Sequence, residues 1–459
     1  MHEGLHRALA GALLLALLPA CGGGGDRVSF FNTEEWAVLR TLSPLPAVPA
    51  DPTNEFSEDA AAGDLGRKYY FDPRFSGPLV DPANAVPPGG NGAVGTVGTI
   101  SCSRCHNPAT GFTDRRSVPG NTSLGAGFTG RHAPTIYNVA YNTWFFWDGR
   151  KDSLWSQALG PTMSPVEHNG NRAQFAMVIR DHYKAEHEAV FGPLPATVAA
   201  LDSILLFPTP PVPPDFPAQG RPGDSLDPLA GGFPAYDGLT AQEKRDVDTV
   251  FVHFGKAIAA YERRVLSTNS AFDRYVAGNE DAIPTAAKRG LKLFFGKAKC
   301  STCHSGPNLT DGKFHSIGVS QSGPSIPAGD DGRMNGIPTV VADVFNGKGA
   351  FSADAMAGAA KLAGLGSTPD PAQQGKFKTP TLRSIGETGP YMHTGAIASL
   401  LEVVAFYNRG GDPGGFSGTN ELAPLGLSFA EMQDLVAFLE TLEGEELPAS
   451  VTAPPVLPP

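Results

Sequence analysis

The clearest periodic pattern in the chain runs from Thr240 to about Val265. Apolar residues recur at helical spacing along one face of this segment: Val247, Val250, Phe251, Phe254, Ile258 and Tyr261. Thr240 and Glu243 have the spacing of a capping box, in which each side chain bonds the backbone N–H of the other residue. The pattern therefore predicts an amphipathic helix that begins after Thr240.

Two more helices are predicted toward the C-terminus from the same kind of signal. Ser399 and Glu402 have capping-box spacing, and the apolar pattern that follows them should end at the glycine stop of Gly410. Ser428 and Glu431 mark the start of another helix. Strand-like alternation is scarce, so the sequence predicts a mainly α fold with long loops.

The composition indicates many loops and argues against nucleic acid as a partner. The 459 residues include 55 glycines and 42 prolines. Two proline-rich stretches stand out: residues 207–234 are predicted to run irregularly over the surface, and residues 448–459 to form a frayed tail. The formal net charge is -11 and no block is rich in Lys or Arg, so nucleic-acid binding is not expected.

The N-terminus has the pattern of a targeting signal. Residues 8–18 are apolar but fall short of the about 20 residues that span a bilayer. The sequence from Leu18 to Cys21 resembles a bacterial lipobox, so residues 1–21 are predicted to be a lipoprotein signal peptide with Cys21 lipidated and residues 22–50 a tether. An ordinary signal peptide with an incidental cysteine is the alternative. Both predict export, and the first predicts a lipid-anchored periplasmic protein at the outer membrane that meets the membrane through its anchor alone.

The other four cysteines all lie in CxxCH sequences. These are formed by Cys102, Cys105 and His106 and by Cys300, Cys303 and His304. In such a sequence the two sulfurs bind the vinyl groups of haem as thioethers, and the histidine ligates the iron. Shared zinc, disulfides and redox dithiols are the alternatives. Zinc or disulfides would leave the repeated histidine unexplained, and a redox dithiol usually lies beside parallel strands, so two c-type haems are predicted.

The two motifs begin 198 residues apart, which suggests two domains of one type. A boundary after the long helix gives an N-terminal domain over residues 51–268 and a C-terminal domain over residues 269–447. Each would be cytochrome c-like and carry one covalent haem.

Several motifs around the CxxCH sequences closely resemble those of the bacterial di-haem cytochrome c peroxidase and MauG superfamily. After the first CxxCH they are Arg131-His132-Ala133-Pro134-Thr135, Phe146-Trp147-Asp148-Gly149-Arg150 and Pro165-Val166-Glu167; after the second they are Phe377-Lys378-Thr379-Pro380-Thr381 and Tyr391-Met392-His393-Thr394-Gly395. The resemblance implies a peroxide-reacting haem in the N-terminal domain and an electron-transfer haem in the C-terminal domain.

The resemblance also implies catalytic roles. Glu167 matches the family's distal carboxylate, which would move a proton between the two oxygens of peroxide. Gln157 and Pro161 keep the family's spacing and would line the same pocket. Trp147 matches the tryptophan between the haems, where it is either a relay for electrons or part of the core.

Two features separate this chain from many of these peroxidases. Residues 117–130 contain no histidine that could close the first haem, so the first iron is predicted to be five-coordinate at rest. Tyr407 stands where the peroxidases have a methionine ligand to the second haem, as in the MauG-like branch. A phenolate stabilises oxidised iron, which favours an oxidase, while Met392 and His393 remain rival ligands and Tyr407 could be a core aromatic.

Two further family features are kept only in part. Calcium between the domains would use the backbone carbonyls of Thr388 and Pro390, but His132 replaces the family's asparagine, so the sequence supports calcium only in part. Ala298 stands where MauG itself has a tryptophan exit, so a partner that forms a tryptophylquinone is not expected.

Three functions follow from these features. The first is a MauG-like oxidase that uses hydrogen peroxide, shares oxidising equivalents between both haems through Trp147 and oxidises an exported protein, with Trp144 and Trp155 as candidate exits. The second is a peroxidase that takes electrons from a small cytochrome or cupredoxin. The third is a non-catalytic electron carrier.

Overall fold

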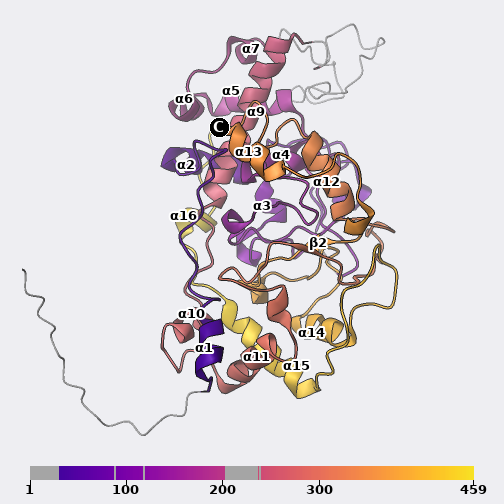
Figure 1. Ribbon diagram of the computed structural model, residues 1–459. Helices are drawn as coiled ribbons and strands as arrows, with labels where there is room; N and C mark the ends of the chain where they lie inside the picture. The colour runs from indigo at the N-terminus through magenta and orange to yellow at the C-terminus, as the bar shows by residue number, and fades with distance from the viewer. Residues whose placement is uncertain (1–29, 87–88, 117–118, 202–235, 237–238) are drawn as a thin grey trace, which may run out of the picture.

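The computed structural model describes residues 30–86, 89–116, 119–201, 236 and 239–459, and it is mainly helical, which confirms the predicted fold class (Figure 1). The predicted signal peptide, Cys21 and the excursion at 207–234 lie outside the described residues. In the described part of the chain no helix is both long and apolar enough to cross a bilayer.

The molecule consists of two lobes, each with its own hydrophobic core. The first lobe contains α2 (Ala60–Phe71), α4 (Leu154–Met163), α5 (Arg172–His182), α6 (Lys184–Phe191), α7 (Ala196–Ala199) and α9 (Ala241–Glu262). The second lobe contains α1 (Thr33–Leu39), α10 (Ala271–Val276), α11 (Thr285–Phe295), α14 (Leu400–Arg409) and α15 (Phe429–Leu439). Most buried residues from Leu65 to Val265 belong to the first core, and most of those from Phe272 to Leu442 belong to the second.

Further helices and one pair of strands complete the structure. They are α3 (Cys102–Cys105), α12 (Arg333–Ala342), α13 (Ala355–Leu362), α16 (Ala449–Thr452) and the antiparallel strands β1 (Phe314–His315) and β2 (Phe377–Lys378). Single 3₁₀ turns occur at Pro82–Ala85, Pro108–Thr110, Val139–Tyr141, Cys300–Thr302, Pro371–Gln373, Ile385–Glu387 and Glu440–Leu442.

The three helices expected from capping signals are confirmed. Thr240, Ser399 and Ser428 are the N-caps of α9, α14 and α15, and each makes the full capping box. Gly410 ends α14 in the left-handed conformation at φ 83°, which glycine adopts without a steric penalty.

One pair of helices crosses at close range in each lobe. A Cβ atom at Gly66 of α2 would lie 1.9 Å from the carbonyl oxygen of Ala257 in α9, and one at Gly290 of α11 would lie 1.9 Å from that of Asp434 in α15. Only glycine allows backbones to approach this closely. The two lobes therefore share one architectural feature.

The predicted frayed tail at 448–459 is wrong. Val451 is buried in the first core, and its carbonyl accepts a hydrogen bond of 2.8 Å from the Tyr261 hydroxyl. Arg67 binds the carbonyl of Ala453 at 2.7 Å, and Arg74 that of Pro458 at 3.0 Å. Proline content correctly indicated irregular backbone, but partners more than 180 residues away hold that backbone in place.

The predicted tether at 22–50 also needs correction in its described part. Residues 33–39 form α1, with a capping box between Asn32 and Glu35, and Phe31, Leu39 and Leu42 are buried in the second core. Phe345 in turn lies in the first core although it follows the predicted boundary. Segments of the chain therefore cross between the lobes, and the ranges 51–268 and 269–447 do not match the two cores in full.

A buried ion pair ties the second lobe together. Arg383 is 1% exposed, and its guanidinium binds both carboxylate oxygens of Asp273 at 2.7 and 3.0 Å. Replacing Arg383 with methionine leaves Asp273 buried and unpaired, so we expect a loss of about 3–5 kcal/mol in the free energy of unfolding. Denaturant unfolding measures this, with Arg409→Met at the exposed pair with Asp412 as a control that costs no more than about 1 kcal/mol.

The pH dependence of stability gives the same pair a second test. Burial alone would raise the pKa of Asp273, but the hydrogen bonds and charge of Arg383 outweigh it and lower that pKa. The stabilisation is therefore present above the unfolded pKa near 3.9 and lost as pH falls through the lower folded pKa. Equal acid sensitivity of the wild type and Arg383→Met would contradict this assignment.

Candidate active site

The two CxxCH sequences present their histidines in the same way. His106 caps α3, and its Nδ1 lies 3.3 Å from the carbonyl oxygen of Phe112; the Nδ1 of His304 lies 3.0 Å from that of Leu309. A carbonyl can only accept, so each Nδ1 carries the proton and each Nε2 keeps a free lone pair. This is the tautomer in which Nε2 ligates a metal.

The cysteines suit thioether attachment better than the alternatives. All four are half-buried and free, and burial raises the pKa of Cys105 and Cys300 to about 12, whereas redox dithiols have a lowered thiol pKa. Within the described ranges, the potential metal-binding group at Cys303 contains Asp311 and His315 and no cysteine of the first motif, so a zinc site shared by four cysteines is not formed.

The segments behind the two motifs repeat each other at a constant separation of 246 residues. Equivalent positions share unusual backbone angles, with φ 55° at both Asn138 and Ser384 and φ 67° and 65° at Gly149 and Gly395. The isolated β-bridge between Phe145 and Lys151 is equivalent to the one between Tyr391 and Ile397. The N-caps Ser153 of α4 and Ser399 of α14 are also equivalent. The two lobes therefore build their sites from one repeated arrangement.

This repeat places Pro161 and Tyr407 at equivalent positions, each the eighth residue after its capping serine. Tyr407 faces the second motif: burial is the largest cause of its raised pKa, followed by the charges of Cys300 and Cys303. No described residue forms a hydrogen bond with the Tyr407 hydroxyl, which leaves its oxygen free to bind another group.

His393, a rival ligand, is engaged elsewhere. Its ring stacks on Phe377 with centroids 3.7 Å apart, and its Nε2 lies 2.6 Å from the amide nitrogen of Gln321. Burial lowers the pKa of His393 to about 3, so the ring is neutral. Met392, the other rival, is half-buried with φ 71°. Of these three candidate ligands, Tyr407 is therefore favoured, because the charges of Cys300 and Cys303 in the second motif act on its hydroxyl.

Glu167 lies close enough to the first motif for its charge to act on Cys102 and Cys105, and its loop packs on the helix that carries Gln157 and Pro161. Gln157 and Pro161 lie one turn apart on α4, and the backbone N–H of His168 donates to the Pro161 carbonyl at 3.1 Å, which folds the Glu167 loop back onto the helix. Burial raises the pKa of Glu167, and the charge of Arg150 and a hydrogen bond with Ser164 offset part of that rise. A half-buried carboxyl with a raised pKa can both take up and release a proton.

Trp147 joins the two lobes. Its indole N–H donates to the carbonyl of His132 at 2.9 Å, and its own carbonyl accepts from the N–H of Lys378 at 2.7 Å. Its ring lies edge-on to His393, with centroids 6.3 Å apart.

His132, which replaces the family's asparagine at the possible calcium site, is buried, and its Nε2 is 3.1 Å from the Thr113 hydroxyl. Calcium at Thr388 and Pro390 stays a prediction.

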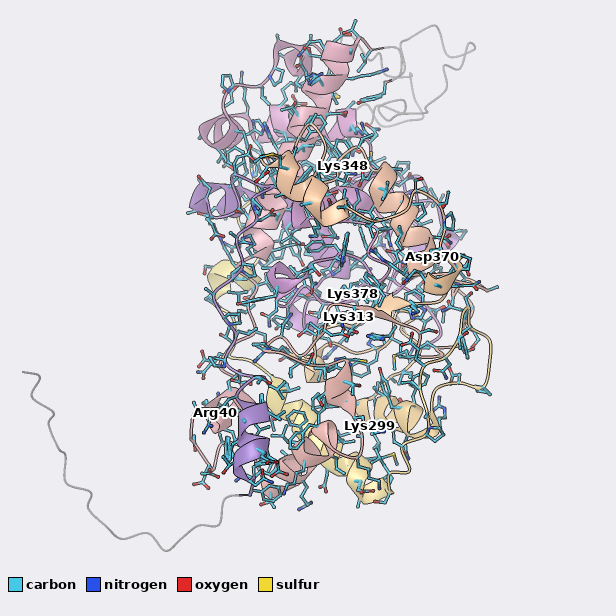
Figure 2. The ribbon with its side chains drawn as sticks, in the orientation of Figure 1. Arg40, Lys299, Lys313, Lys348, Asp370 and Lys378 are labelled. Atoms are coloured by element: carbon cyan, nitrogen blue, oxygen red, sulfur yellow. The ribbon has the colours of Figure 1, made fainter. Side chains whose placement is uncertain are left out.

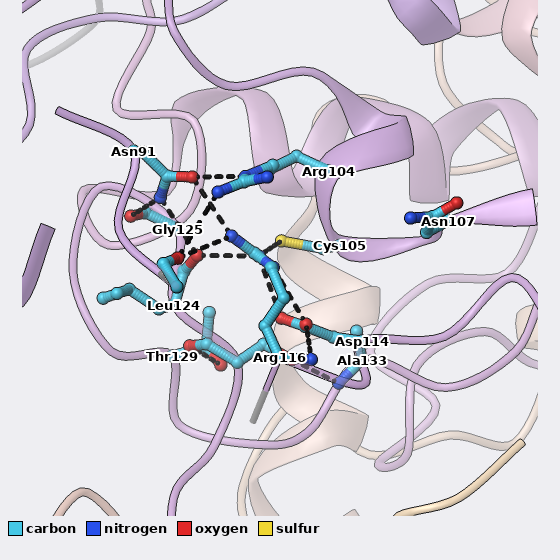
Figure 3. Close-up of polar contacts among 12 residues, drawn as sticks. Asn91, Arg104, Cys105, Asn107, Asp114, Arg116, Leu124, Gly125, Thr129 and Ala133 are labelled. Atoms are coloured by element: carbon cyan, nitrogen blue, oxygen red, sulfur yellow. Dashed lines mark hydrogen bonds and ion pairs between the residues drawn. The ribbon is translucent and has the colours of Figure 1, made fainter. Parts of the chain in front are cut away.

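Three polar residues of the first site were missed by sequence reasoning. Arg150, the last residue of the motif at 146–150, was given no role from the sequence, but it acts on Glu167 and stacks on Phe146 with its guanidinium carbon 3.6 Å from the ring centre. His168 follows Glu167, and its Nε2 is 3.9 Å from the sulfur of Cys102. Arg116 lies 3.6 Å from the sulfur of Cys105 and is held by Asp114 (Figure 3). The available signals were membership of a motif for Arg150 and adjacency to Glu167 for His168.

Comparisons with known proteins identify the family of this chain. The family model described as di-haem cytochrome c peroxidase matches residues 60–209. Cytochrome-c peroxidase IdrP1 of Denitromonas iodatirespirans is 32% identical over 88% of this chain and 87% of its own length. The chain belongs to the di-haem cytochrome c peroxidase and MauG family.

Both branches of this family are represented among the relatives. The methylamine utilization protein MauG of Methylorubrum extorquens is 30% identical over 95% of this chain and 92% of its own length. A MauG-like protein associated with microbial copper homeostasis has the same fold, with a TM-score of 0.56, 24% identity and coverage of 90% of this chain and 98% of that one. Family membership makes this chain a di-haem oxidoreductase that acts with peroxide.

The described residues fit two c-type haems. Each CxxCH offers two free thiols and an imidazole with a free Nε2, and α4 and α14 place Pro161 and Tyr407 at equivalent positions of the repeat. His106 and His304 would be the proximal ligands, with Cys102, Cys105, Cys300 and Cys303 as the attachment points.

Proposed function

We propose that this protein is a MauG-like oxidase, in which peroxide reacts at the haem of the first motif and the oxidising equivalents are passed on to a protein partner. The observation that carries the proposal is the equivalence of Pro161 and Tyr407. The proline side chain has no lone pair to offer a metal, whereas a phenol can bind as an oxygen ligand. The repeat therefore supports one site open to peroxide and one closed by Tyr407.

Haem, when bound, supplies the iron that activates peroxide and accepts and passes on electrons. The chain supplies the proton transfer. In the proposal, the Glu167 carboxylate accepts the proton of the peroxide oxygen nearer the metal and returns it to the outer oxygen, so that water can leave. The Gln157 amide, which lies one turn from Pro161 and has no partner among the described residues, orients the peroxide by hydrogen bonding.

Trp147 is better suited than Trp144 or Trp155 to carry oxidising equivalents. Trp144 lies under the cations of Arg333 at 4.6 Å and Lys361 at 5.3 Å, and Trp155 lies 5.8 Å from Lys256. A cation over the ring opposes loss of an electron from it. Trp147 has no such contact in the described part of the chain and connects both lobes. Of these three tryptophans, Trp147 at the junction of the lobes is therefore the preferred carrier of oxidising equivalents.

A peroxidase fed by a small acidic redox protein is the second candidate. It is favoured by Lys299 and Lys313, which are exposed near the second motif and make no ion pair with a described residue (Figure 2). Exposed lysines of this kind attract acidic partners and raise association rates at low salt. IdrP1, a relative in this family, is named a cytochrome-c peroxidase.

Ligand titration of the resting holoprotein tests the open first site. Cyanide or azide should bind one of the two haems and convert its high-spin bands to low-spin bands, while the other haem is unaffected. Rapid turnover of reduced cytochrome c with peroxide would favour the peroxidase instead. Binding at neither haem would leave only electron carriage and would overturn the oxidase proposal.

We also propose that the protein is exported and anchored through Cys21, on the basis of the lipobox-like sequence. The test is mass spectrometry of the mature N-terminus in wild type and Cys21→Ala. A diacylglyceryl group on Cys21 would support the anchor, and cleavage elsewhere without lipid would contradict it.

A further inference from the structure

Two cations near the junction of the lobes have no carboxylate partner among the described residues. Arg333 is 4% exposed, and its Nη1 donates only to the backbone carbonyls of Gly149 at 2.8 Å and Asp148 at 3.3 Å. The ammonium group of Lys378 is half-buried and makes neither a hydrogen bond nor an ion pair there. Figure 2 shows Lys378 at the level where the two lobes meet.

The fold brings these two cations to the same place. Lys378 and Phe314 are direct partners in the antiparallel pair of β1 and β2, so their side chains lie on the same face. The guanidinium carbon of Arg333 lies 4.2 Å from the centre of the Phe314 ring. The backbone N–H of Lys378 is bonded to the carbonyl of Trp147, so both cations lie beside the residue that joins the lobes.

The nearest acidic side chain cannot neutralise them. Among the described residues, Asp148 is the one group whose charge supports that of Arg333, but its carboxylate already binds Arg131 at 2.5 Å and Arg150 at 3.1 Å. Burial lowers the pKa of Arg333 to about 10 and that of Lys378 to about 8. Two poorly solvated cations with no anion are costly, so the site is built for a negatively charged group.

We propose that Arg333 and Lys378 bind haem propionate carboxylates at the junction of the two lobes, beside Trp147. The propionates are the anionic groups of a c-type haem, and a guanidinium binds a carboxylate through paired hydrogen bonds. The inference rests on the attachment of two haems, which the proposed function shares, but not on the identity of the oxidised partner.

The test uses the holoprotein and compares Lys378→Met with Lys378→Arg and with Lys313→Met. Lys313 is a matched control because it adjoins β1, is exposed and also makes no ion pair with a described residue. Loss of a cation beside a propionate disfavours the reduced haem. Lys378→Met should therefore lower the reduction equilibrium constant of one haem at least tenfold, equal to 59 mV for one electron, while Lys378→Arg restores most of the loss and Lys313→Met shows little.

Resonance Raman spectra provide a second measurement that does not depend on activity. The propionate bending band of one haem should shift in Lys378→Met, and a milder variant, Arg333→Lys, should shift it if the methionine variant fails to fold. Unchanged potentials and bands in a variant that holds both haems would overturn the inference. Cyanide binding in that same variant would leave the proposed function standing, so the two failures can be told apart.

Discussion

Glu167→Gln is expected to slow the reaction of the diferric protein with peroxide by about 10²–10⁴-fold, the usual contribution of a positioned acid–base group. Glutamine keeps the size of the side chain but cannot accept the peroxide proton. Haem content and cyanide binding should be unchanged, because Glu167 is not an attachment residue. Stopped-flow absorbance at the first haem measures the rate.

The pH dependence of the peroxide reaction rate provides a second test of the role of Glu167. The reaction needs the carboxylate form, so the wild-type rate should rise as pH increases through the pKa of Glu167, which burial raises above its ordinary value. Glu167→Gln should lose this rise. The matched control is Glu446→Gln at an exposed position, which should behave as wild type. A variant at 167 with wild-type rate and profile would remove Glu167 from the proposed chemistry.

Tyr407→Phe should change the second haem and abolish the shared oxidised state. Removing the phenol oxygen of Tyr407 should convert a low-spin haem to high-spin and raise its reduction potential by on the order of 0.1 V, within the range that axial ligands set. If the two haems share oxidising equivalents after peroxide addition, as proposed, the wild type should show a long-lived near-infrared charge-resonance band, and this band should disappear in the variant. Absorption and electron paramagnetic resonance spectra of the resting protein provide the first measurement.

Tyr391→Phe is the matched control for this change. Tyr391 belongs to the same repeat and is half-buried, but its hydroxyl donates to the Ile385 carbonyl at 3.0 Å. Its loss should cost one hydrogen bond and leave both haem spectra as in wild type. If Tyr407→Phe kept a low-spin second haem, Met392 or another side chain would be the ligand.

Local signals in the sequence predicted the elements that depend on local contacts. The capping boxes at Thr240, Ser399 and Ser428 were visible because the two side chains of each lie three positions apart. The CxxCH motifs were visible for the same reason. The equivalence of Pro161 and Tyr407 was hidden because the CxxCH motifs are separated by 198 residues and the helices α4 and α14 by 246, so no single offset aligns both parts.

By itself, the sequence determined the helices with their caps, the two attachment motifs and the family whose chemistry they carry. Only the tertiary structure decided that α1 joins the second lobe, that Val451 and Phe345 pack in the first, and that Arg333 and Lys378 both neighbour Phe314 near Trp147. The physical reason is the distance along the chain over which each feature is formed. A cap or a haem motif is complete within a few residues, whereas burial and charge pairing depend on which distant segments fold against each other.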